Sequence, residues 1–173
     1  LFMTLILPDL FAQEPVKNRK ERREQRQEKR MEEVKNMILD KSFVFVPTHA
    51  MPLGGGSIQL SYTFEAEVKG DSIFSYLPFY GVAYHVEYGS RNSPFDFSLP
   101  IENYEVEEDD KGYRITLEVK NKMDFVTYSL FVSEMGYSTL NATSTNRQAI
   151  SYYGRIEKPE EEWKRGLVGI GGD

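Results

Sequence analysis

The chain has 173 residues, of which 40% are hydrophobic and 28% are charged, a balance typical of a globular domain with a solvated surface. It contains no cysteine, which excludes disulfides, thiolate catalysis and cysteine-bound metal clusters. The net charge of −6 divides into −1 for residues 1–13, +3 for residues 14–35 and −8 for residues 36–173. An acidic body repels phosphate backbones, so we expect no nucleic acid among its partners.

Residues 1–13 begin with an apolar run, Leu1 to Leu7, and reach a small residue at Ala12. This pattern resembles the back half of a signal peptide, although the charged start of such a peptide is missing. We therefore expect a signal-peptide remnant and a periplasmic or secreted protein. The alternative is an N-terminal strand or arm buried in the domain. Because the run is too short to cross a bilayer, we do not expect a membrane-spanning protein.

Residues 14–40 form a glycine-free stretch made largely of Arg, Lys, Glu and Gln, which are strong helix formers. The stretch predicts one charged α-helix. Its apolar residues come late, at Met31, Val34 and Ile38, so only the last turns have a face to bury. We expect the first half to project into solvent as a spacer, or alternatively to dock an envelope protein partner.

From Lys41 onward the hydrophobic period becomes two. The clearest case runs from Ile58 to Val68, where apolar residues at even positions alternate with polar ones for eleven residues. Such alternation is typical of strands with one buried and one wet face, which favours antiparallel pairing. The remaining candidate strands are Phe43–Val46, Ser72–Leu77, Val82–Tyr88, Phe95–Leu99, Tyr104–Glu107, Tyr113–Lys120, Val126–Ser133, Tyr137–Thr143 and Ala149–Ile156.

The turns between these strands are too short to hold crossover helices. We therefore predict that successive strands pair as hairpins in a meander. The apolar faces can be hidden by closing the sheet into a calycin- or lipocalin-like β-barrel, which we prefer, or by stacking two sheets in a β-sandwich. The predicted barrel domain covers residues 41–157, and residues 158–173 are expected to form a flexible C-terminal tail.

The densest aromatic region lies between residues 76 and 88. Tyrosine combines an apolar ring with a hydroxyl, which suits a ligand cavity at a barrel mouth or stacking on a sugar. The alternative is that these rings fill the core and hydrogen-bond at its rim. The candidate ligand-binding residues are Tyr76, Phe79, Tyr80, Tyr84 and Tyr88.

Other polar residues give weaker signals. His49 and His85 are the only histidines, and their spacing from carboxylates matches no metal site, so we expect no metal and no cofactor. We also expect no catalytic residues, because no acid, base and nucleophile stand out together. The turn at Asn146 and Arg147 offers an arginine that could bind a carboxylate, but we favour a structural role in which it caps the barrel end.

Two stretches, Gly70–Tyr84 and Ser133–Ile156, resemble the domain-of-unknown-function family numbered 4251, found in secreted proteins of Bacteroides-like bacteria. The similarity covers roughly Val34 to Ile156 and includes Lys41–Phe45. The resemblance implies an exported protein with a calycin-like β-barrel and supplies no catalytic residues. We therefore expect a non-enzymatic domain that binds a small hydrophobic or glycan-like ligand, or alternatively a structural or protein-interaction module of the cell envelope.

Overall fold

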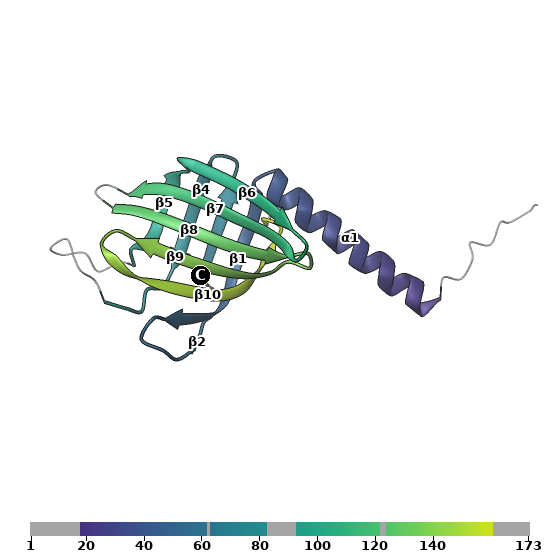
Figure 1. Cartoon of the computed structure of the whole chain (residues 1–173), viewed down its shortest axis with the longest axis horizontal. Helices are drawn as coiled ribbons and strands as arrows, with labels where there is room; N and C mark the ends of the chain where they lie inside the picture. Colours follow the sequence, from purple (N-terminus) through teal and green to yellow (C-terminus); the bar gives the residue numbers. More distant parts are fainter. Residues whose placement is uncertain (1–17, 62, 83–92, 122–123, 161–173) are drawn as a thin grey trace, which may run out of the picture.

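The computed structural model describes residues 18–61, 63–82, 93–121 and 124–160. Within these ranges the chain forms one helix, α1, followed by one ten-stranded antiparallel sheet that curls around its own apolar face (Figure 1). None of the helical structure in these ranges is both long and apolar enough to cross a membrane. The predicted class, a mainly β antiparallel fold preceded by a charged helix, is confirmed.

Helix α1 spans Arg19–Leu39. Its first turn is held by the backbone N–H of Asn18, which donates to Glu21 Oε2 (3.2 Å). Residues 19–29 are all exposed, and in Figure 1 this half points away from the sheet. The last turns bury Val34, Met37 and Ile38, as the late apolar residues predicted. Residues 14–17 of the predicted helix lie outside the described ranges.

The strands have between two and eleven residues, and most of them follow one another through short connections, with a longer segment between β4 and β5. They are β1 (Ser42–Pro52), β2 (Ile58–Gln59), β3 (Glu65–Lys69), β4 (Ser72–Leu77), β5 (Phe95–Pro100), β6 (Asn103–Asp109), β7 (Gly112–Asn121), β8 (Asp124–Ser133), β9 (Tyr137–Ser144) and β10 (Arg147–Glu157). The alternating runs of β7 and β8 turn their apolar residues inward as predicted. Most of the predicted strand Val82–Tyr88 falls outside the described residues.

The sheet order is β5-β4-β3-β1-β10-β9-β8-β7-β6, so the first and last long strands pair in the middle of the sheet and the edges are β5 and β6. Only Ile101 and Glu102 separate these edges. Ile101 N–H donates to Asp71 O, beside β4, while Glu102 N–H donates to Glu118 O on β7. The chain thus changes partner at this point, and the two edges are consecutive halves of one bent segment.

This connection corrects the prediction that all successive strands pair as hairpins. Strands β5 and β6 run in the same direction, because each is antiparallel to a neighbour and an even number of ladders separates them. The two-residue link therefore carries the chain on in the same direction instead of reversing it. The single curled sheet agrees with the barrel prediction rather than with two stacked sheets, although no ladder joins β5 directly to β6 among the described residues.

A second correction concerns the predicted strand Ile58–Val68, which is broken into β2 and β3. Strand β2 pairs with His49–Ala50 and β3 with Ser42–Phe45, and between them β1 carries Pro47. Proline has no N–H to donate to a ladder, so pairing is interrupted on this stretch. The ladder to β10 also shifts register between Pro47 and His49.

Helix α1 closes one end of the curled sheet, which we call the helix end. Arg30 reaches across it: Nη2 donates to Ile156 O (2.8 Å) and Nε to Met135 O (3.3 Å). The hydroxyl of Tyr104, on β6, donates to the backbone oxygen of Ile38 in the last turn of α1 (3.0 Å). The opposite end, which we call the far end, carries no helix among the residues that the structure describes (Figure 1).

Candidate functional site

The candidate aromatic residues do not share one surface. Tyr76 lies on the outer face of β4 and is 47% exposed, where its ring stacks on Phe64 with centroids 5.3 Å apart. Phe79 and Tyr80 follow β4 at the far end and are partly buried against the core. Tyr84 and Tyr88 lie outside the described residues. The structure thus separates Tyr76 from Phe79 and Tyr80.

A chain of ring contacts leads from the far end into the interior. Phe79 meets Phe95 edge to face, with centroids 5.8 Å apart, and Phe95 meets Tyr128 at 5.9 Å. Tyr128 also lies against Phe97 at 6.1 Å. Phe95 and Tyr128 are buried, whereas Phe79 and Phe97 remain partly exposed, so the wall is aromatic from its rim inward.

Segment 78–82 is fastened across the far end by strand β10. The Tyr152 hydroxyl donates to Pro78 O (2.7 Å) from inside the sheet. Gln148 N–H donates to Val82 O (3.1 Å), and its side-chain Oε1 accepts from Val82 N–H (3.3 Å). These bonds hold the segment that follows β4, which includes Phe79, against the first half of β10.

The interior hydroxyls already have partners. Ser75 Oγ donates to Phe95 O (2.8 Å), so it must accept the bond from the Tyr128 hydroxyl (2.9 Å). Burial raises the pKa of Tyr128 well above its usual range. Burial also raises the pKa of Tyr152 above its usual range, and the nearby Tyr128 and Tyr80 hydroxyls raise it further.

These raised pKa values predict a loss of stability in alkali. Because the unfolded chain loses its tyrosine protons first, near pH 10, the free energy of unfolding falls as pH rises above about 10, by up to about 1.4 kcal/mol per pH unit for each buried tyrosine. Tyr152→Phe should lower this slope by about that amount, measured by urea unfolding at a series of pH values. Tyr153→Phe, at an exposed neighbour, is the control; an unchanged slope in Tyr152→Phe contradicts the prediction.

Arg147 also lies at the far end, where β10 begins. Its guanidinium sits 5.7 Å from the centre of the Phe79 ring, a cation–π contact. Its position at the end of the sheet agrees with the predicted capping role. Ser144, which pairs with Arg147, donates its hydroxyl to both carboxylate oxygens of Asp124 (2.9 and 2.7 Å).

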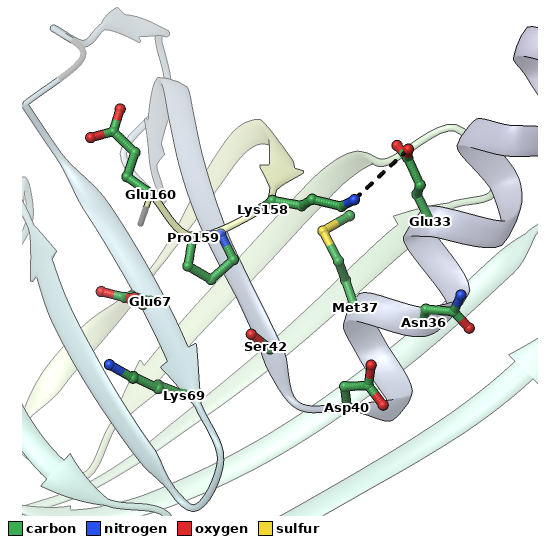
Figure 2. Close-up of a pocket in the computed structure, with 10 residues that line it drawn as sticks. All are labelled: Glu33, Asn36, Met37, Asp40, Ser42, Glu67, Lys69, Lys158, Pro159 and Glu160. Carbon is green, nitrogen blue, oxygen red and sulfur yellow. Dashed lines mark ion pairs between the residues drawn. The ribbon is translucent and has the colours of Figure 1, made fainter. Parts of the chain in front are cut away.

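The helix end holds a separate groove of about 510 Å³ between α1, the outer face of β1 and β3, and the residues after β10 (Figure 2). An ion pair between Lys158 and Glu33 (3.8 Å) spans its upper side, and Met37 extends toward Lys158. The buried Glu67 lies on its floor. Sequence patterning gave no signal for this groove, because it depends on how the C-terminal residues return to the helix.

Metal-binding geometry is not found among the described residues: no group of three or more His, Asp or Glu side chains comes together there. His49 Nδ1 lies 3.0 Å from the Thr48 hydroxyl next to it in the chain. His85 lies outside the described ranges. The expectation that the chain holds no metal and no catalytic residues stays a prediction.

The geometry defines a curled antiparallel β-sheet domain with a helix across one end. The family model for "Domain of unknown function (DUF4251)" matches residues 25–156, and the chain belongs to this family. The chain is similar in fold to the crystal structure of a DUF4251 family protein from Bacteroides eggerthii, with a TM-score of 0.55 and 11% identity over 75% of this chain and 87% of that one. The comparison with curated proteins finds no match.

Proposed function

We propose that the chain is a non-catalytic binding domain that holds a small apolar ligand at the far end of its curled sheet. The observation that supports this proposal is the aromatic wall that runs from Phe79 through Phe95 to Tyr128. Phe79 and Tyr80 keep part of their surface uncovered at the rim, where a ligand can pack against them. Helix α1 closes the other end, so the proposed ligand would reach the sheet from the far end.

The chemistry of the wall favours an apolar ligand over a glycan. A sugar needs hydrogen-bond partners for its hydroxyls, since burying them unpaired is costly. The interior hydroxyls of Tyr128 and Tyr152 are engaged with Ser75 and Pro78, respectively. A ligand made of rings or methylene groups needs no hydrogen bond from these hydroxyls.

Fluorescence titration with N-phenyl-1-naphthylamine, a neutral aromatic dye, tests the proposal. We expect saturable binding that Phe79→Ala weakens about tenfold, because the dye loses about 1.4 kcal/mol of contact with the removed ring. Tyr76→Ala removes an aromatic ring from the outer face and should leave the affinity unchanged. Absence of binding, or equal effects of the two substitutions, would overturn the proposal.

We propose a periplasmic or secreted location, supported by the resemblance of residues 1–13 to part of a signal peptide. Cell fractionation with immunodetection of the native protein checks this location. Recovery of the mature protein with the cytoplasmic fraction would contradict it.

The exposed half of α1 supports a second candidate function, docking of an acidic envelope protein. Its described first turns align Arg19, Arg22, Arg23 and Arg26 on one exposed face. In situ crosslinking from a photoreactive residue placed at Arg22 should capture one defined partner. Failure to capture any partner from this position would remove the support for docking.

A further inference from the structure

Arg147 is turned toward the inside of the sheet by an irregularity in its strand. Arg147 pairs with Ser144, whereas Ile150 pairs with Ala142, so the register shifts by one residue between them. Ser144 also pairs with Val126, which belongs to the inward row of β8. Because directly paired residues share a face, Arg147 lies on the inward face at the far end.

The guanidinium of Arg147 is incompletely satisfied there. Its Nε is buried and, within the part of the chain that the structure describes, has no hydrogen-bond acceptor. Asp124 accepts the hydroxyl of Ser144, the residue paired with Arg147, but no ion pair among the described residues joins Asp124 to Arg147. A partly buried guanidinium without a carboxylate partner is costly, so an anionic group that reaches its terminal nitrogens gains more than it would at an exposed arginine.

We infer that Arg147 binds the anionic head of the ligand, a carboxylate or a sulfonate, while the ligand's apolar body packs on Phe79. This inference rests on the proposed function and adds the charge of the ligand to it. A planar guanidinium can offer its two terminal nitrogens to two oxygens of one acidic group. Phe79 lies under the same guanidinium, so the polar and apolar contacts fall side by side.

Two dyes that differ by a single acidic group test the inference. N-phenyl-1-naphthylamine is neutral, and 8-anilinonaphthalene-1-sulfonate is the same framework carrying a sulfonate. We expect the intact chain to bind the sulfonate at least tenfold more tightly than the neutral dye. Arg147→Met should abolish this preference and change the affinity for the neutral dye less than twofold. Arg147→Lys, which retains the charge but not the fork, should keep part of the preference.

Arg155→Met is the matched control, because Arg155 lies on the same strand and pairs with Glu157 in an exposed position. It should leave the preference unchanged, and circular dichroism verifies that every variant is folded. If the neutral dye binds but the sulfonate gains nothing, or if Arg147→Met and Arg147→Lys both keep the full preference, the inference fails and the proposed function stands. If neither dye binds, the proposed function itself fails.

Discussion

Gly154→Ala is expected to lower the free energy of unfolding by about 3 kcal/mol, as overpacking against a rigid neighbour does. Gly154 pairs with Pro47 where β1 meets β10. A Cβ at this position would overlap the carbonyl oxygen of Val46 and lie 2.8 Å from Pro47 Cα. Both obstacles are backbone atoms, so no side-chain rotation relieves them, and the first and last long strands must move apart.

Urea unfolding at neutral pH measures the effect, and Gly54→Ala provides the control. Gly54 lies in the loop after β1, where an added Cβ meets no atom within 4 Å, so its substitution should change the free energy of unfolding by less than about 0.5 kcal/mol. Equal stabilities of the two variants would show that β1 and β10 tolerate a wider separation at Pro47 than the ladder implies.

Most strand positions followed from the alternation of apolar and polar residues in the sequence. In β7 and β8, Ile115, Leu117, Tyr128 and Leu130 face inward as the alternation required. The run Ile58–Val68 has the same alternation and still breaks, because alternation is local whereas a strand also needs a partner able to pair. Its partner β1 contains Pro47, so the interruption originates in a different segment from the one that carried the pattern.

The link at Ile101 and Glu102 was missed for a similar reason. A short connection between two alternating runs usually indicates a hairpin. Whether the chain reverses or bends there depends on which strands are free to pair on each side, and these are Ser72–Leu77 for β5 and Gly112–Asn121 for β6. Whether the chain reverses is decided by the pairing of the whole sheet, so the residue types at Ile101 and Glu102 do not indicate it.

The candidate site was only partly predictable. In β4 both faces carry apolar residues, Ile73 and Leu77 inward and Phe74 and Tyr76 outward, so the alternation could not tell which rings face the interior. The inward aim of Arg147 depends on the register shift in β10, which has no signal in the residue types. The sequence identified Arg147 as a residue of the sheet end, and its unpartnered Nε emerged only in three dimensions.

Ile38→Ala should lower the free energy of unfolding by about 3 kcal/mol, because it empties a fully buried site in the last turn of α1. Leu39→Ala, at the next residue but with a side chain that is 61% exposed, should cost less than about 1 kcal/mol, measured by the same urea titration. The contrast tests whether α1 belongs to the core of the domain or only rests on it. Equal losses would mean that its last turn is not packed against the sheet, and the helix would then no longer close the end opposite the proposed ligand entrance.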